Sequence, residues 1–213
     1  MMNLISEEIE EYCERYSSPE SNVLYELNRQ THLRSMMPQM LSGPVQGGFL
    51  HLLCRIIKPR RILEIGTFTG YAAIQMAQSL AEDGILYTID DNEELCEIQK
   101  EFIARAGLEE RIIRLCGDAK TILPELSEKW DLVFLDADKV SYPFYYQCLM
   151  QKMTAGSLIL ADNVLWSGKV LLPEPEDEDT AALVAFNKMV LEDERVENVL
   201  LPIRDGLMMI WIK

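Results

Sequence analysis

Apolar and polar residues follow two different rhythms after residue 58, and these rhythms predict strands and helices in turn. The strand candidates are short apolar runs without strict alternation, which is typical of strands covered on both faces. They lie at residues 61–66, 85–90, 111–116, 131–136 and 157–162. Segments that fit helices lie between them, near residues 70–82, 92–106, 118–127 and 141–153. Strands that alternate with helices predict an α/β fold with a doubly wound parallel sheet.

The C-terminal region departs from this alternation. After a predicted helix near residues 178–193, the apolar runs VENVLLPI and GLMMIWIK are joined by Arg204-Asp205-Gly206. Asp-Gly between two such runs is typical of a hairpin. We therefore expect the last strand to run antiparallel to its neighbour.

The N-terminal region, residues 1–57, is predicted to form helices that precede the sheet. Two of them are separated at SSPES, where Ser18 is the expected cap and Pro19 the first helical turn. A third is expected to end near residue 57, before Lys58-Pro59. Together with a Rossmann-like core over residues 58–213, these helices predict one domain over residues 1–213.

Composition narrows the class of protein. Of the 213 residues, 48% are hydrophobic and 26% charged, which is typical of a soluble globular chain. The N-terminus is acidic, unlike a signal peptide, and no apolar run approaches the ~18 residues of a membrane span, so we expect a cytoplasmic protein. The five cysteines are widely spaced and indicate reduced thiols. A net charge of -15 opposes binding to phosphate backbones, so a small-molecule partner is favoured over nucleic acid or a membrane.

A glycine turn follows the first predicted strand, in the segment LEIGTFTGYAA. Its Glu64-x-Gly66-x-x-x-Gly70 pattern is not GxGxxG and has no phosphate-binding lysine, which disfavours a pyrophosphate ligand. Asp90 ends the next strand, where a carboxylate accepts hydrogen bonds from ribose hydroxyls in doubly wound folds. The pair predicts an adenosine ligand. The alternative is a plain strand-to-helix turn with Asp90 as a helix cap.

Oxygen ligands close two consecutive strands. Asp136 ends one, and Asp162 with Asn163 ends the next. Because such strands are neighbours and their carboxyl ends share one edge, these oxygens are expected to meet and to suit Mg²⁺ or Ca²⁺. Beside a cation the pKa of Lys139 would fall, which makes this residue a candidate proton acceptor. The alternative is that the acids are loop caps and Lys139 is a surface residue.

Three segments together, LEIGTFTGYAA, LDADK and ADNVLWSGKV, resemble the cation-dependent O-methyltransferases, the family of caffeoyl-CoA and catechol O-methyltransferases. The resemblance covers about residues 36–213. It implies a seven-stranded sheet with its last strand reversed, S-adenosylmethionine (SAM) as methyl donor, a bound divalent cation (Mg²⁺, or Ca²⁺ or Mn²⁺) and a homodimer.

The resemblance also assigns residues. It implies Asp136, Asp162 and Asn163 as metal ligands and Lys139 as the general base, with Asp136 also beside SAM. The further residues implied at the SAM site are Ser42, Glu64, Gly66, Thr67, Asp90, Ala119 and Asp138. Ala72 belongs to the same site but stands where family members often carry a serine that bonds the cofactor. Our candidates for the acceptor pocket are Trp166, Ser167, Met36, Met37 and Met40, because aromatic and methionine side chains make adaptable walls for flat rings.

The implied reaction moves a methyl group from SAM to an aromatic hydroxyl. A phenol with a pKa near ~10 needs activation, which chelation of two adjacent hydroxyls and proton transfer to Lys139 would supply. The acidic chain offers no evident platform for coenzyme A phosphates, which favours a free catechol-like acceptor. Three alternatives stay open: a tRNA 5-hydroxyuridine O-methyltransferase of the same fold, a nucleotide-dependent oxidoreductase, and a non-catalytic SAM or metal binder. The net charge opposes the first and the missing GxGxxG the second.

Overall fold

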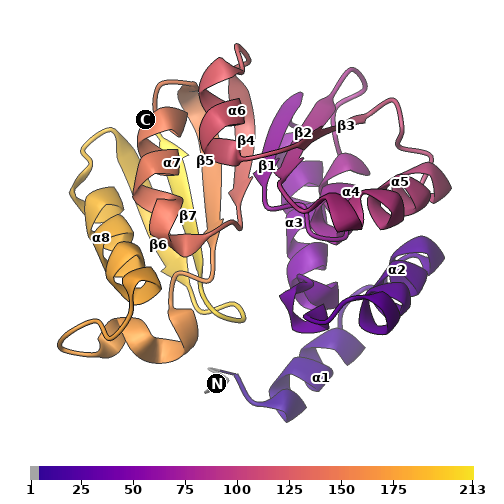
Figure 1. Cartoon of the computed structure of the whole chain (residues 1–213), viewed down its shortest axis with the longest axis horizontal. Coiled ribbons are helices and arrows are strands. Elements are labelled where there is room, and N and C mark those ends of the chain that lie inside the picture. The colour runs from indigo at the N-terminus through magenta and orange to yellow at the C-terminus, as the bar shows by residue number, and fades with distance from the viewer. Residues whose placement is uncertain (1–4) are drawn as a thin grey trace.

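A computed structural model describes residues 5–213. Its centre is a seven-stranded sheet of order β3-β2-β1-β4-β5-β7-β6 (Figure 1). The strands are β1 (Arg61–Ile65), β2 (Ile85–Asp90), β3 (Ile112–Cys116), β4 (Trp130–Leu135), β5 (Met153–Asp162), β6 (Val196–Leu201) and β7 (Leu207–Ile212). The pairs among β1 to β5 are parallel, and β7 is antiparallel to both β5 and β6. The predicted α/β class and the reversed last strand are confirmed.

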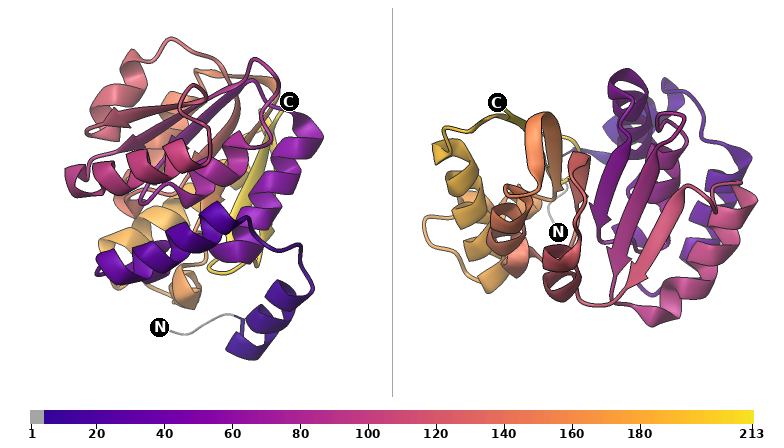
Figure 2. Two further views of the ribbon diagram at one scale, coloured as in Figure 1. Left: turned by 90° about the vertical axis from the view of Figure 1, so that its right-hand side faces the viewer. Right: turned by 90° about the horizontal axis from the view of Figure 1, so that it is seen from above.

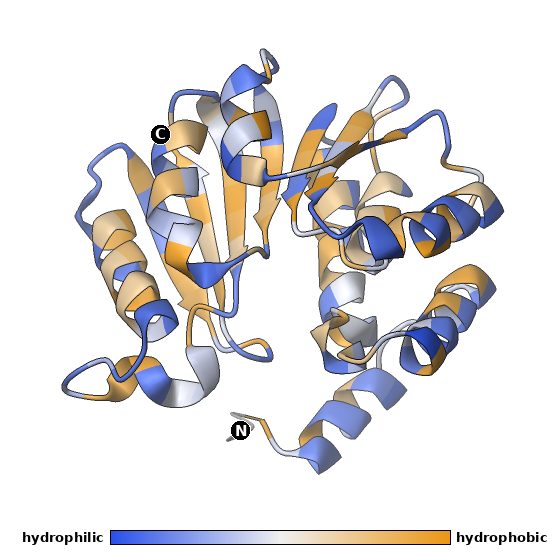
Figure 3. Cartoon of the chain, in the orientation of Figure 1, coloured by the Kyte–Doolittle hydropathy of each residue, from blue (hydrophilic) through white to orange (hydrophobic). Residues whose placement is uncertain are grey.

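Helices cover both faces of this sheet (Figures 1 and 2). One apolar core joins the sheet to α2 (Asn22–Arg34), α3 (Gly43–Ile57), α4 (Tyr71–Ala77) and α5 (Cys96–Arg105). The other joins it to α6 (Ala119–Glu125), α7 (Tyr142–Leu149) and α8 (Glu178–Glu192). The strands are consequently apolar along most of their length, whereas the helices alternate between apolar and polar positions (Figure 3). This pattern explains why the buried strands lacked strict alternation in the sequence.

Several boundaries differ from the predicted ones. The helix α2 begins at Asn22, and its cap is Ser21, whose hydroxyl accepts the Leu24 N–H at 3.4 Å. The expectation of a cap at Ser18 and of Pro19 in the first turn was therefore wrong. Strand β5 begins at Met153, four residues before its predicted start at 157, because the Trp130–Met153 pair lies beyond a bulge in the β4–β5 pairing.

The N-terminal helix α1 (Glu7–Arg15) contains no buried residue and projects from the body of the molecule (Figure 2). Short 3₁₀ turns connect other elements: η1 (Pro38–Met40), η2 (Glu93–Leu95), η3 (Lys139–Ser141) and η4 (Trp166–Leu171). All five cysteines are free, as expected. Within residues 5–213, no helix has the length and apolar character needed to cross a membrane.

Candidate active site

The carboxyl ends of β1, β4 and β5 meet at one edge of the sheet, because β4 pairs with both of the other strands. Asp136 follows β4 directly, and its N–H donates to the carbonyl of Ile65 at the end of β1 at 2.9 Å. Asp162 is the last residue of β5. The pairing of neighbouring parallel strands thus brings both predicted acids to the same edge, where ligands gather in doubly wound folds.

Asp162 is held in a fixed orientation. Only 2% of the residue is exposed. Its Oδ2 accepts a hydrogen bond from Gln46 Nε2 at 2.7 Å, and its Oδ1 accepts the Asn163 N–H at 2.8 Å. Burial, and then the charge of Asp136, raise the pKa of Asp162 to about 6. Two acidic groups placed so close together favour a positive partner between them.

Lys139 lies beside Asp136 and Asp162, and these three residues form the acidic cluster of the site. Only 7% of Lys139 is exposed, so the alternative that Lys139 is a surface residue is wrong. Its Nζ donates to Asp136 Oδ1 at 3.0 Å and to the Tyr142 hydroxyl at 2.8 Å. Burial lowers the pKa of Lys139, but Tyr142 and the carboxylates of Asp136 and Asp162 outweigh burial and raise it. In the metal-free chain the ammonium form is therefore favoured, and the lower pKa expected from the sequence requires a cation beside it.

The glycine turn lies against the same edge. Gly66 has a φ of 99°, and an added Cβ there would stand 1.9 Å from the carbonyl oxygen of Asp136. Asp90 holds the turn, since its Oδ2 accepts the Phe68 N–H at 2.7 Å and its Oδ1 accepts the Asn92 N–H at 2.9 Å. Only glycine fits at position 66, because any side chain would collide with backbone. The turn is thus built around close approach of β1 and β4.

Glu64 carries an acceptor without a partner. The residue is fully buried, and while its Oε2 accepts from the Thr88 hydroxyl, its Oε1 has no hydrogen-bond partner among the described residues. Burial, together with the nearby Asp136 and Asp90, raises the pKa of Glu64 to about 8. Buried polar atoms are normally satisfied, so Oε1 points to a missing donor, such as a hydroxyl or amino group of a ligand.

This raised pKa predicts a pH dependence of stability. A carboxyl whose pKa is higher in the folded chain stabilises that chain when protonated, so this contribution is complete below about pH 4.5 and is lost as pH rises through about 8. Each unit of pKa difference is about 1.4 kcal/mol, which corresponds to roughly 3–6 °C in a protein of this size. We therefore expect the melting temperature of the ligand-free protein to fall by at least ~3 °C between pH 5 and pH 8.

The variant Glu64→Gln should show a smaller fall over the same range, because the amide does not titrate. Scanning calorimetry of both proteins at a series of pH values measures this difference. Titration of other groups, such as Asp162, is common to both proteins and cancels in the comparison. Equal slopes for the two proteins would show that Glu64 titrates normally.

The remaining predicted cofactor residues come from several elements. Ala119 begins α6 after Gly117, whose N–H donates to the Asp90 carbonyl at 2.9 Å. Asp138 Oδ1 accepts from the Tyr145 hydroxyl at 2.9 Å. The others, which are all buried, are Thr67 in the turn, Ala72 in α4 and Ser42 just before α3.

The predicted acceptor residues are divided between two loops. Trp166 and Ser167 have left-handed backbones, with φ values of 48° and 53°, and Lys139 Nζ lies 6.0 Å from the centre of the Trp166 ring. Trp166 thus lies beside Lys139 of the acidic cluster. Met36, Met37 and Met40 lie on the loop before α3 and are at least half exposed. Exposure of these methionines leaves them available to a ligand but does not join them to the cluster.

Sequence patterns missed four side chains near the site. The Tyr142 hydroxyl accepts a hydrogen bond from Lys139 Nζ. Tyr142 follows Lys139 by three residues, a spacing that could have indicated the contact. Gln46 of α3 donates to Asp162, and Arg204, in the turn between β6 and β7, donates to Gln46. Asp205 Oδ1 accepts the Ser167 N–H and so supports the loop that carries Trp166. The last three have no local signal, because their partners are distant in the chain.

Comparison with known proteins agrees with this geometry. A family model described as O-methyltransferase matches residues 14–212. The chain is 34% identical to a caffeoyl-CoA O-methyltransferase of Populus kitakamiensis, over 96% of this chain and 93% of the relative. It is 33% identical to a catechol O-methyltransferase of Niastella koreensis, over 94% and 92% of the two chains.

Solved structures extend the comparison to the fold. The O-methyltransferase from Bacillus cereus in complex with SAH is 29% identical, with a TM-score of 0.90 over 97% of each chain. The O-methyltransferase TomG from Streptomyces achromogenes in complex with SAM is 29% identical, with a TM-score of 0.89 over 97% of this chain and 96% of that chain. The sequence motifs, the sheet order and these relatives agree, and the chain belongs to the O-methyltransferase family of the caffeoyl-CoA and catechol O-methyltransferases.

Proposed function

We propose that the protein transfers a methyl group from SAM to a hydroxyl of a catechol-like or other vicinal-hydroxyl aromatic molecule, with the help of a divalent cation. The observation that carries this proposal is the cluster of Asp136, Lys139 and Asp162 at the ends of β4 and β5, with Asn163 directly after Asp162. Membership of the O-methyltransferase family makes an oxidoreductase a poor account of the same cluster.

The donor set suits a hard cation. Within residues 5–213 no group of three or more His, Cys, Asp or Glu side chains could hold a metal, so a cation here would need the amide oxygen of Asn163 beside Asp136 and Asp162. Magnesium is often bound by one or two carboxylates and keeps several places for water or substrate oxygens. When bound, the ion would lower the pKa of a chelated hydroxyl. The raised pKa of Asp162 supports this assignment, because a bound cation would lower that pKa.

The glycine turn suits SAM. The unpartnered Oε1 of Glu64 can accept from a ligand hydroxyl or amino group. Gly66 is filled on its side-chain side by the Asp136 backbone, whereas the left-handed Gly70 leaves backbone open to close approach, since only Gln99 lies as near as 4.0 Å to an added Cβ. Asp90 closes β2 beside the turn, where a ribose would lie. We assign Ser42, Thr67, Ala72, Asp138 and Ala119 to the same ligand. The SAH and SAM in the complexes of the two solved relatives support the choice.

Lys139 is the proposed general base. Its ammonium form is held by Asp136 and Asp162, so Lys139 becomes a proton acceptor only when these carboxylates are neutralised by another partner. Its Nζ lies 3.0 Å from Asp136 Oδ1, close to the place where an acceptor hydroxyl would be held. Proton transfer by a well-placed side chain contributes typically about 10²–10⁴-fold in rate.

We expect Lys139→Met to reduce kcat by about 10²–10⁴-fold while the KM for the acceptor changes by less than about threefold. The reason is that Lys139 would act on the proton in the transition state and not on the bound ring. Steady-state kinetics with a catechol at saturating SAM measures both constants. A matched control is Lys169→Met, which removes an exposed lysine paired with Asp177. A large rise in KM with an unchanged kcat would instead make Lys139 an acceptor-binding residue.

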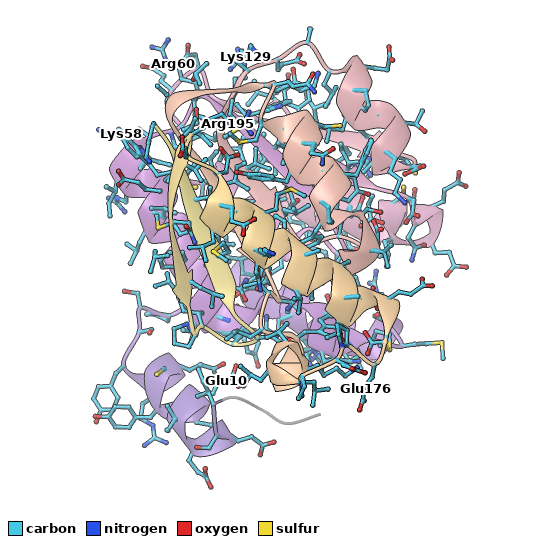
Figure 4. All side chains as sticks on the ribbon, turned by 90° about the vertical axis from the view of Figure 1, so that its left-hand side faces the viewer. Glu10, Lys58, Arg60, Lys129, Glu176 and Arg195 are labelled. Carbon is cyan, nitrogen blue, oxygen red and sulfur yellow. The ribbon has the colours of Figure 1, made fainter. Side chains whose placement is uncertain are left out.

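The acceptor is proposed to be small and free of phosphate. Lys58, Arg60, Lys129 and Arg195 lie together at the amino ends of the strands, at the opposite edge of the sheet from the acidic cluster (Figure 4). The cluster itself is bordered by Trp166, whose ring suits a flat acceptor. This distribution of charge favours a catechol over tRNA, because an RNA would need basic residues beside the site.

The test is an incubation of the purified protein with labelled SAM and a panel of catechols, caffeate esters and flavonoids, with Mg²⁺ and then with EDTA. Methylated product that disappears with EDTA is the expected result. Methylation of tRNA that carries 5-hydroxyuridine, instead of any phenol, would favour the tRNA alternative. Binding of SAM without any product would favour the non-catalytic binder.

We also propose that two copies associate. Ile9 and Tyr12 on α1 and Tyr16 directly after it are all more than half exposed, and α1 buries no residue in its own chain. A helix gains most of its stability by packing an apolar face, so α1 needs another surface. Light scattering of the purified protein tests for a dimer.

A further inference from the structure

The side chain of Gln46 connects the N-terminal helices to the end of β5. Gln46 is fully buried in α3, and its Nε2 donates to Asp162 Oδ2 at 2.7 Å. The two residues are 116 positions apart in the chain. A buried hydrogen bond to a carboxylate is stronger than a neutral one and fixes the direction of the group that accepts it.

Arg204 decides which way the Gln46 amide points. Arg204 Nη1 donates to Gln46 Oε1 at 3.2 Å. A guanidinium has only donors, so the oxygen of the amide must face Arg204 and its NH₂ must face Asp162. The opposite orientation would place donor against donor on one side and acceptor against acceptor on the other.

Several hydrogen bonds hold the guanidinium of Arg204 in place. It lies in the turn between β6 and β7, and its Nη1 also donates to the carbonyls of Leu41 at 2.9 Å and Ser42 at 2.7 Å. Its Nη2 donates to the carbonyl of Gln39 at 3.3 Å. One guanidinium therefore holds the loop before α3 and, through Gln46, the carboxylate of Asp162.

Asp162 is consequently oriented before any ligand binds. Gln46 occupies one lone pair of Oδ2 and the Asn163 N–H occupies one of Oδ1. Each carboxylate oxygen keeps further acceptor capacity for a cation. A carboxylate that is already fixed loses less conformational freedom on binding than one that rotates.

We propose that Gln46 is a positioning residue that sets the orientation of Asp162 for a divalent cation, with Arg204 setting the orientation of Gln46. This inference rests on the proposed cation site. Loss of a hydrogen bond that orients a metal ligand typically lowers metal affinity by about 10–100-fold. The N-terminal helices and the C-terminal hairpin would then both contribute to a site whose ligands come from β4 and β5.

The test is Gln46→Met, which keeps the length of the side chain and removes its donor. We expect the Kd for Mn²⁺, measured by electron paramagnetic resonance without SAM or acceptor, to rise by about 10–100-fold. The Kd for SAM, measured by calorimetry without metal, should stay within about twofold. The matched control is Gln75→Met, at a buried glutamine of α4, which should bind Mn²⁺ as the unchanged protein does.

Arg204→Met provides a second measurement on a residue of the β6–β7 turn. It should weaken Mn²⁺ binding at least threefold, and the loss in the double variant should be smaller than the product of the two single losses, because both act through one amide. Unchanged Mn²⁺ affinity in Gln46→Met and Arg204→Met, with binding abolished in Asp162→Ala, would overturn the inference alone. Equal Mn²⁺ affinity in Asp162→Ala and the unchanged protein would overturn the proposed cation site as well.

Discussion

Methyl transfer is expected to fall by about a thousandfold when Asp162 is replaced by alanine. A cation that polarises the acceptor contributes several kcal/mol to stabilisation of the transition state, and each 1.4 kcal/mol is about tenfold in rate. Asp162 is the more deeply buried of the two proposed carboxylate ligands, so water cannot readily replace it. Turnover of a catechol with saturating Mg²⁺ measures the effect.

The folded state should survive this substitution. Burial and the charge of Asp136 raise the pKa of Asp162 and outweigh the hydrogen bonds from Gln46 and Asn163, so ionisation of this carboxyl does not add to the stability of the folded chain without a cation. The melting temperature of Asp162→Ala should therefore stay close to that of the unchanged protein, and SAM should still bind. Full methyltransferase activity in the variant would remove the cation from the mechanism, whereas loss of SAM binding would show that the damage extends to the glycine turn.

A second large effect is expected on stability, from Gly66→Ala. The added Cβ would stand 1.9 Å from the carbonyl oxygen of Asp136 and 2.7 Å from its carbonyl carbon. Neither strand can withdraw easily, since the Gly66 N–H donates to Ile89 and the Asp136 N–H donates to Ile65, each at 2.9 Å. The collision adds to the strain of a side chain at a φ of 99°.

Overpacking costs about 1–3 kcal/mol and an unfavourable backbone about 1–3 kcal/mol, so we expect a loss of about 2–6 kcal/mol. Thermal and urea unfolding measure it. The control is Gly107→Ala, at a φ of 67° with no atom within 4 Å of the added Cβ, which should lose only the backbone part. Equal losses in the two variants would show that β4 moves aside and that the close approach at Gly66 is not rigid.

Local patterns in the sequence were enough for most of the fold and for the acids. The apolar runs, the glycine turn and the Asp-Gly junction each depend on neighbours within a few residues, and they predicted the parallel strands and the reversed β7. Because the carboxyl ends of neighbouring strands share an edge, the order of β4 and β5 also placed Asp136 and Asp162 together. The cap at Ser21 was missed because Ser18 carries the same local signal, and packing of Leu24 and Leu27 decided where α2 begins.

The tertiary structure alone decided how these acids are held and charged. Gln46 and Arg204 reach the site from segments 116 and 158 residues away from their partners, and no periodicity records such a contact. The pKa of Lys139 likewise depends on burial, which lowers it, and on Tyr142 and two carboxylates from different strands, which outweigh burial and raise it. Sequence determines which chemical groups end each strand, because strand and helix propensity act over short distances. Packing determines their orientation and protonation, because desolvation and hydrogen bonding depend on every element that closes around them.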